Sequence, residues 1–318
     1  MEKAFIDYSQ GNSVVPPVAE LLFENPPGDV HIKYGYIKGG AFKLRGAANS
    51  ILSLTESEKK RGVITISTGN HGKAVAYVGK QLGVKTVVCV SELVPQVKID
   101  AIKTLGARVV IAGKNQEEAT NTSMEMGKKE GLRFISAYDD PDVIAGQGTI
   151  MLEILKQQPK TDTLIAPVSG GGLMGGMSFV AKTINPDIKI IGVTNDREPA
   201  IYRSIKAGHI VQVDEFESLA DAITGPISND NQYTFKLCNA YIDELLLISE
   251  KQIAQAMVYA LLKEKQVLEG GGAVSIGLLL DKRIPKLLGD SVVAVCSGNS
   301  VDINLLLSLV EKYKHEIS

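Results

Sequence analysis

The sequence predicts an α/β protein with two parallel sheets, each covered by helices on both faces. From residue 61 onward, short β-branched runs alternate with segments of helical periodicity, which is the pattern of parallel sheets. Apolar residues within the runs are nearly continuous, as expected of strands that are buried on both faces. The predicted strands are residues 63–67, 85–90, 108–112, 133–137, 163–168, 189–194 and 291–297.

Helices are predicted in the intervals between these strands. In residues 72–82, Val75, Val78 and Leu82 repeat at the spacing of a helix face that packs on a sheet. Three segments end in a glycine, which suits the left-handed conformation in which helices commonly end; these are Gly83, Gly106 and Gly131. Further helices are predicted over residues 97–105, 116–129, 142–156 and 252–264.

The order of these elements predicts two domains. Four strand–helix units between about residues 61 and 137 form one small sheet, and the units from residue 163 onward form a larger one, to which residues 12–48 return. A helix that opens at Asp139-Asp140-Pro141 crosses between them, and the site is expected between the two sheets, at the carboxyl ends of the strands. The predicted division is a large, discontinuous domain of residues 1–50 and 141–318 and a small α/β domain of residues 51–140.

The composition excludes several classes of protein. The 318 residues are 44% hydrophobic, which excludes disorder, and the net charge of −2 provides no basic field for a nucleic acid. No apolar run approaches the roughly 20 residues of a membrane span, and residues 1–10 lack the apolar core of a signal peptide. Cys89, Cys238 and Cys296 are far apart and have apolar neighbours, which is typical of buried thiols in a reducing compartment. We therefore expect a cytoplasmic protein with neither nucleic acid nor membrane as a partner.

The first of three glycine-bearing turns contains a lysine between apolar neighbours. In the segment from Gly39 to Ala47, Lys43 lies between Phe42 and Leu44. Burial there would keep the amine partly neutral, and a neutral amine can attack a carbonyl group. The alternative is a solvated lysine on a helix surface.

The second turn, residues 67–72, joins a predicted strand to a predicted helix. The hydroxyls of Ser67 and Thr68, the Asn70 carboxamide and the first N–H groups of the helix converge there, which suits a carboxylate. The alternative is a turn in which a hydroxyl only caps the helix. His71 is either an acid–base group or a hydrogen-bonded structural residue.

The third turn, residues 169–176, follows a predicted strand and opens a helix with several glycines, so a phosphate is its leading ligand. Gly170, Gly172 and Gly175 also fall at the positions of a dinucleotide fingerprint, with Asp196 after the next strand, so an NAD-dependent oxidoreductase is a rival hypothesis. No metal site is expected, because the four histidines are isolated and no two cysteines have ligand spacing.

Together, the three turns supply what pyridoxal phosphate needs: an amine for its aldehyde, a carboxamide for its ring hydroxyl and glycines for its phosphate. The chain resembles the fold-type II pyridoxal-phosphate enzymes of the threonine/serine dehydratase and serine racemase family, whose fold is tryptophan synthase β-like. This resemblance makes the dinucleotide hypothesis remote. The matching segments, in the family's order, are GGAFKLRGA, STGNHG, DDPDVIAGQGT (139–149), SGGGL (169–173), EGGGA (269–273) and CSGN (296–299).

The resemblance implies a role for each matching residue. Lys43 would hold the cofactor as a Schiff base and act as the catalytic base, with Phe42 beside the ring. Asn70 would contact the ring hydroxyl and Ser297 the pyridine nitrogen. The phosphate would be bound by Ser169, Gly170, Gly171, Gly172 and Leu173, and the substrate carboxylate by Ser67, Thr68, Gly69 and His71.

The resemblance also implies a homodimeric ammonia-lyase that removes water and then ammonia from a small-molecule amino acid, a β-hydroxy amino acid such as L-threonine or L-serine. A racemase with the same cofactor is the alternative, but racemases have a serine where this chain has Thr68. Thr194 stands where many members have a glutamate metal ligand, so no metal is expected. Residues 218–222 and 230–235, with Thr194, resemble the hydroxyectoine-utilisation dehydratase branch, so a dehydratase of that pathway also stays open.

Overall fold

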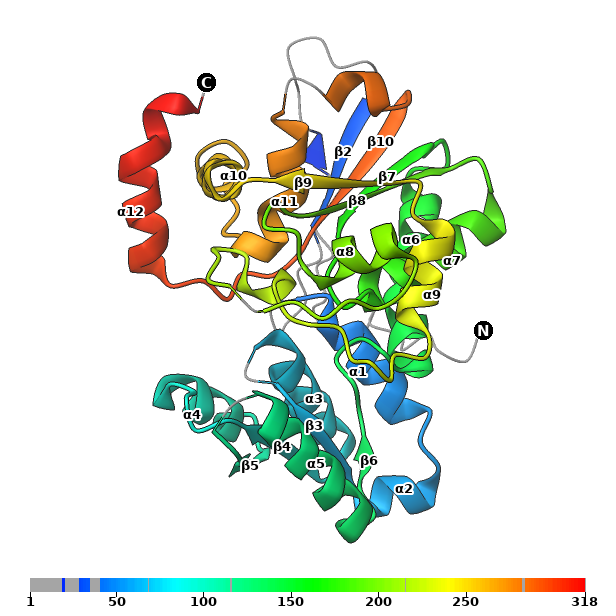
Figure 1. Ribbon diagram of the computed structural model, residues 1–318, viewed down its shortest axis with the longest axis vertical. Coiled ribbons are helices and arrows are strands. Elements are labelled where there is room, and N and C mark those ends of the chain that lie inside the picture. The colour runs from blue at the N-terminus through cyan, green and yellow to red at the C-terminus, as the bar shows by residue number, and fades with distance from the viewer. Residues whose placement is uncertain are drawn as a thin grey trace. The chain divides into compact units, whose positions relative to one another are not determined.

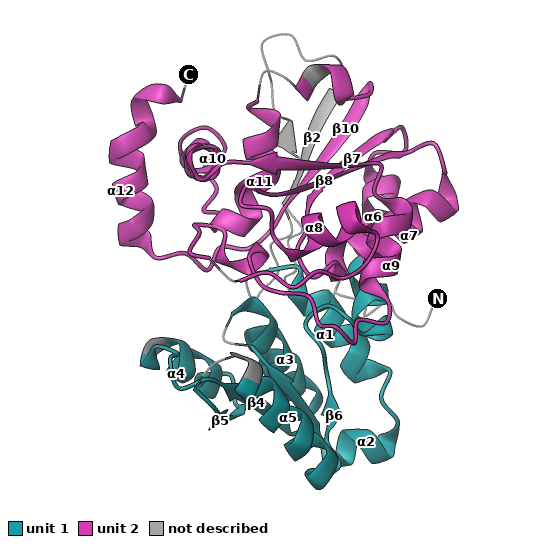
Figure 2. Ribbon diagram, in the orientation of Figure 1, with its two compact units in different colours: residues 1–13, 37–147 teal, residues 14–36, 148–318 magenta. Residues whose placement is uncertain are grey.

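The computed structural model describes residues 19–20, 29–34, 41–67, 69–114, 116–214, 216–281 and 284–317. The chain forms two compact units, which Figure 2 colours separately: residues 1–13 with 37–147, and residues 14–36 with 148–318. Each unit has its own sheet and its own buried core. Among the residues that the sequence singles out, Gly39, Gly40 and Thr68 lie outside the described residues.

The first unit is built on a four-stranded parallel sheet with the order β5-β4-β3-β6. Its strands are β3 (Val63–Ile66), β4 (Thr86–Val90), β5 (Arg108–Ile111) and β6 (Arg133–Phe134). Its helices are α1 (Lys43–Leu52), α2 (Glu56–Arg61), α3 (Asn70–Leu82), α4 (Gln96–Thr104), α5 (Gln116–Glu130) and the first part of α6 (Pro141–Gln157).

Successive residues of these strands pack into different cores, so both faces of the sheet are covered. Val63 of β3 shares a core with α1 and α3, and Val88 of β4 shares one with α3 and α4. Their neighbours Ile64 and Val87 point to the other face, where they join Met126 of α5. Burial on both faces explains why the strands are almost entirely apolar.

The second unit is built on a six-stranded sheet with the order β1-β2-β10-β7-β8-β9, in which only the β1–β2 pair is antiparallel. Figure 1 shows α10, α11 and α12 on one side of this sheet and α6, α7 and α9 on the other. Its strands are β1 (Ala19–Glu20), β2 (Asp29–Tyr34), β7 (Thr163–Pro167), β8 (Lys189–Asn195), β9 (Glu244–Ile248) and β10 (Ser291–Cys296). Its helices, besides the rest of α6, are α7 (Gly172–Ile184), α8 (Ala200–Ala207), α9 (Thr234–Tyr241), α10 (Glu250–Leu262), α11 (Gly270–Leu279) and α12 (Ile303–Tyr313). Of the helices described, none is both long and apolar enough to cross a membrane.

The predicted α/β class with two helix-covered, largely parallel sheets is confirmed, and each of the seven predicted strands contains a strand. Gly83, Gly106 and Gly131 adopt the left-handed conformation expected of them, with φ of 67°, 91° and 67°. The prediction was wrong at β6, which ends at Phe134 instead of residue 137. The chain turns there because the Ser136 hydroxyl accepts hydrogen bonds from the next backbone N–H groups. Strand β9 was not predicted.

Among the described residues, the compact units differ from the predicted domains in two segments. Residues 37–50 and 141–147 belong to the first unit, because Leu44 and Ile51 of α1 share a core with α3 and with Val143 of α6. The boundary between the units therefore falls within α6. The predicted domain division and the predicted place of the site between the sheets stay predictions.

Candidate active site

Lys43 is the first residue of α1, and its amine is held by the chain that follows β6. The neighbouring Leu44 is buried in the core that α1 shares with α3, which fixes the direction of the helix. The partly buried Lys43 Nζ donates a hydrogen bond to the carbonyl oxygen of Ala137 at 2.5 Å. It also lies 5.2 Å from the centre of the Phe42 ring. The alternative of a solvated surface lysine therefore does not hold.

Burial changes the acidity of this amine. Desolvation lowers the pKa of Lys43 from 10.5 to about 8, because the charged ammonium loses more hydration than the neutral amine. At pH 7.5, about a quarter of such amines are neutral, compared with about 0.1% at the ordinary pKa. Lys43 is therefore equipped to act as a nucleophile or a base near neutral pH.

The lowered pKa predicts a pH-dependent penalty on stability. The unfolded chain binds the Lys43 proton more tightly than the folded chain, so the penalty is complete below pH 8 and disappears as the pH rises toward 10.5. Lys43→Met should therefore stabilise the cofactor-free protein at pH 7 by ~1–3 kcal/mol, and the gain should shrink at pH 9.5. Urea unfolding at both pH values measures this, with the exposed Lys85→Met as the control. A gain in the free energy of unfolding that is the same at both pH values would contradict a lowered pKa of Lys43.

The turn after β3 leaves the start of α3 without a side-chain cap. Gly69 is the N-cap residue and has no side chain to bond the first N–H groups of the helix. The Ser67 hydroxyl accepts a hydrogen bond from the Gly69 N–H at 3.2 Å, which tightens the turn and does not cap α3. A Cβ on Gly72 would lie 2.2 Å from the Ser67 carbonyl oxygen, so only glycine permits this close approach. The uncapped N–H groups beside Asn70 suit an anion.

His71 is buried, with 2% of its surface exposed. Its Nε2 lies 3.3 Å from the Ile135 carbonyl oxygen, so Nε2 carries the proton and donates. Desolvation, helped by the nearby Lys43 charge, lowers the pKa of His71 to about 3, which makes the ring neutral at physiological pH. Among the residues that the structure describes, none forms a hydrogen bond with the buried Nδ1.

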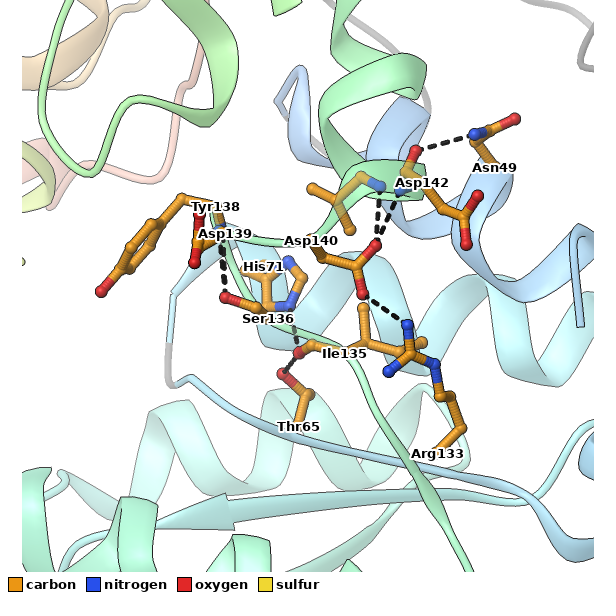
Figure 3. Close-up of polar contacts among 11 residues, drawn as sticks. Asn49, Thr65, His71, Arg133, Ile135, Ser136, Tyr138, Asp139, Asp140 and Asp142 are labelled. Atoms are coloured by element: carbon orange, nitrogen blue, oxygen red, sulfur yellow. Dashed lines mark hydrogen bonds and ion pairs between the residues drawn. The ribbon is translucent and has the colours of Figure 1, made fainter. Parts of the chain in front are cut away.

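Figure 3 shows how the chain after β6 is held in place. The buried Asp140 carboxylate accepts the N–H groups of Asp142 and Val143 at 2.9 and 3.1 Å, which caps α6, and pairs with Arg133 at 3.1 Å. The Ser136 hydroxyl accepts the N–H groups of the two residues before Asp140. Ala137, whose carbonyl oxygen accepts the Lys43 amine, therefore lies in a segment that is held by hydrogen bonds.

In the second unit, the glycine turn follows β7 and begins α7. Gly171 is the N-cap residue, with a φ of 87° that glycine adopts without strain. A Cβ on Gly171 would lie 2.9 Å from both Cys238 Sγ and Thr234 Cβ, so α9 packs directly against the turn. Because the N-cap residue has no side chain, the first N–H groups of α7 suit a phosphate.

Ser297 follows β10 and is buried, and the beginning of α11 packs behind it. A Cβ on Gly272 would lie 2.4 Å from the Ser297 carbonyl oxygen. The Glu269 N–H donates to the Gly298 carbonyl oxygen at 3.0 Å, and the Glu269 carboxylate accepts the Ser300 N–H at 3.0 Å. The EGGGA segment thus anchors the CSGN turn.

Each sheet brings part of the predicted site together. In the first unit, β3 and β6 are neighbours, so residues 67–71 and 135–137 follow parallel strands at the same edge. In the second unit, β7 and β10 are neighbours, so residues 169–173 and Ser297 share an edge. The Ala137 carbonyl and the α9 side chains that support Gly171 were not predicted, because neither forms a sequence motif. These groups fit the predicted cofactor: an amine of lowered pKa, a glycine-rich helix start and a buried serine.

A comparison with known protein families shows to which family the chain belongs. Residues 17–298 match the family described as pyridoxal-phosphate dependent enzyme. The chain belongs to this family. Pyridoxal phosphate is therefore its cofactor, and the predictions of the family, the fold class and enzymatic activity are confirmed.

Individual proteins of this family are similar over most of the chain. An L-threonine ammonia-lyase from Thermotoga maritima is 36% identical over 295 residues, which are 92% of this chain and 73% of the relative. The solved structure of the processed form of threonine deaminase isoform 2 from Solanum lycopersicum is 35% identical, with a TM-score of 0.83, over 90% of this chain and 83% of that one. Maize serine racemase is 28% identical, with a TM-score of 0.83, over 91% and 88% of the two chains.

Proposed function

We propose that this enzyme is an ammonia-lyase that converts a β-hydroxy amino acid, such as L-threonine or L-serine, into a 2-oxo acid and ammonia. The observation that carries the proposal is the amine of Lys43, partly buried at the start of α1 with a pKa of about 8. The similarity to an ammonia-lyase and a threonine deaminase supports the reaction class.

The residues that would hold the cofactor follow from the family resemblance. Lys43 would bind its aldehyde carbon, with Phe42 beside the ring and Asn70 at the ring hydroxyl. The N–H groups of residues 169–173 would bind its phosphate, and Ser297 would contact its pyridine nitrogen. Bound pyridoxal phosphate supplies an electron sink that acidifies the Cα–H of an attached amino acid.

Lys43 would then move the proton. In its neutral form the amine removes the Cα proton, and as an ammonium it can return a proton to the departing β-hydroxyl, so water leaves without free hydroxide. Addition of water then releases ammonia, and the net reaction gives one 2-oxo acid and one ammonia. A pKa of about 8 suits both directions of transfer near neutral pH.

The other groups orient the substrate and set the reaction type. The start of α3, which has no side-chain cap, would bind the substrate carboxylate together with Ser67 and Gly69, through the favourable helix dipole. Thr68 is proposed at the same carboxylate from the resemblance alone. Ser297 is a neutral hydroxyl, which cannot hold the pyridine nitrogen protonated as a carboxylate does, and this favours β-elimination over chemistry that needs a long-lived carbanion.

A substrate panel tests this proposal. The holoenzyme is incubated with L-threonine, L-serine and 3-hydroxyaspartate, and both 2-oxo acids and D-isomers are quantified. Release of a 2-oxo acid from at least one substrate is the expected result. A D-isomer as the main product would favour a racemase, to which the likeness to maize serine racemase points. Preference for 3-hydroxyaspartate would favour a dehydratase of the hydroxyectoine branch, whereas absence of all these products would contradict the proposal.

We further propose a cytoplasmic homodimer. The homodimer rests on the family resemblance alone. The cytoplasmic location is supported by Cys89, Cys238 and Cys296, which are buried free thiols as expected in a reducing compartment. Analytical ultracentrifugation of the holoenzyme tests the dimer, and a monomer at micromolar concentration would contradict it.

A further inference from the structure

We propose that His71 is a positioning residue: it donates a fixed hydrogen bond to the segment Ile135–Ala137 and thereby places the acceptor of the Lys43 amine. The family resemblance assigns His71 to the substrate carboxylate. The surroundings of the ring point to this different role. The proposal rests on the proposed function only in so far as Lys43 is the catalytic amine.

The hydrogen bond between His71 and Ile135 has a fixed direction. The Ile135 carbonyl can only accept, so the His71 Nε2 at 3.3 Å must donate. With 2% of its surface exposed, the ring is cut off from solvent. The neutral form is also the one that the environment favours, since burial and the Lys43 charge both lower the pKa of His71. A ring held in this state is a poor acid and a poor base near pH 7.

His71 shares the carbonyl group of Ile135 with Thr65. The Thr65 hydroxyl donates to the same Ile135 oxygen at 2.8 Å, so both lone pairs of that oxygen are used. The Cα pairing of β3 with β6 ends at Ile64 and Phe134. Beyond that point, side chains from β3 and α3 continue to hold the chain after β6, as Figure 3 shows.

Only a short stretch of chain separates Ile135 from the acceptor of the Lys43 amine. The carbonyl that accepts the Lys43 amine belongs to Ala137, two residues after Ile135. On its far side, the segment is fixed by the Asp140 carboxylate, which caps α6 and pairs with Arg133. If the hydrogen bonds to Ile135 are lost, the segment that contains Ala137 is held on one side only. The Ala137 carbonyl can then move, and the Lys43 amine becomes more exposed to solvent.

Two substitutions of His71 separate positioning from substrate contact. His71→Gln keeps a donor near the place of Nε2, whereas His71→Asn moves the donor back to the place of Nδ1. We expect His71→Asn to lower kcat about 2- to 10-fold, the effect of one hydrogen bond, with the KM for the amino acid changed less than about twofold. His71→Gln should restore kcat. A rise in KM of about tenfold or more in both variants, with kcat unchanged, would overturn the proposal.

Two measurements on the cofactor-free protein need no lyase activity. The pH dependence of acylation at Lys43, followed by peptide mass spectrometry, should show a raised pKa in His71→Asn and the wild-type pKa in His71→Gln. Nitrogen-15 NMR of the His71 ring should show a proton on Nε2 and no titration between pH 5 and 9. Titration near pH 6.5, or a Lys43 pKa that is the same in both variants, would overturn the proposal even if the proposed reaction is correct.

Thr65 provides a second probe in case His71→Asn fails to fold. Thr65→Val removes the other donor to the Ile135 carbonyl at nearly constant volume, and Thr65→Ser keeps it. We expect Thr65→Val to raise the Lys43 pKa as His71→Asn does, and Thr65→Ser to leave it unchanged. An unchanged Lys43 pKa in Thr65→Val would show that this carbonyl does not position the amine.

Discussion

Replacing Lys43 by alanine is expected to lower the rate of 2-oxo acid formation at least about 10²- to 10⁴-fold, the contribution of one well-placed acid–base group. The loss arises because the Lys43 amine is proposed both to bind the cofactor and to move the Cα proton. Lys43→Arg should lower this rate to the same degree, since a guanidinium stays charged and cannot act as a neutral amine. The rates follow from the release of 2-oxo acid under saturating pyridoxal phosphate.

Lys85→Ala is the control for this experiment, because Lys85 is an exposed lysine of the same unit. Its activity should stay within about twofold of the wild type, as expected for a surface substitution away from special features. If Lys43→Ala kept the wild-type rate, a different residue would have to carry the chemistry.

Gly171→Ala is expected to destabilise the protein and to weaken its binding of pyridoxal phosphate. Alanine at a φ of 87° costs about 1–2 kcal/mol for the left-handed backbone. The new methyl group would also lie 2.9 Å from Cys238 Sγ and Thr234 Cβ, and overpacking adds a further ~1–3 kcal/mol. Because the turn or α9 must shift, the N–H groups proposed for the phosphate move with it. Thermal unfolding and cofactor titration measure the two effects.

Gly208→Ala separates the backbone cost from the steric one. Gly208 ends α8 at a φ of 74°, and a Cβ there would have no atom within 4 Å. This variant should lose only the backbone contribution and bind the cofactor as the wild type does. Equal losses of cofactor affinity in Gly171→Ala and Gly208→Ala would show that the turn at Gly171 does not hold the phosphate.

The strands that could be predicted from the sequence are those whose composition is typical of a strand alone. Runs such as Val87-Val88-Cys89-Val90 are β-branched and apolar, so their pattern is typical of a doubly buried strand. Strand β9 has the sequence Glu-Leu-Leu-Leu-Ile, and leucine suits a helix as well as a strand, so the pattern could not identify it. The assignment of α1 to the first unit depends on long-range packing of Leu44 and Ile51, which periodicity does not reveal.

The parts of the candidate site that could be predicted from the sequence are residues whose type has a characteristic chemistry. A lysine between apolar neighbours and glycines at helix starts can be recognised in the sequence, so a function could be proposed for each of them. The acceptor of the Lys43 amine does not, because it is the backbone carbonyl of Ala137, 94 residues later, and every residue has such a carbonyl. The support of Gly171 by Cys238 was hidden for a similar reason, since it depends on the packing of α9. For His71 the sequence left two roles open, and burial is the property that distinguishes them.

Borohydride reduction of the holoenzyme, followed by peptide mapping, tests the central claim most directly. Reduction fixes the cofactor to the amine that holds it, so the attachment point can be identified by mass. We predict a single pyridoxyl group on Lys43, in the peptide that contains the start of α1. A label on any other lysine of an active preparation, with Lys43 unmodified, would contradict the account.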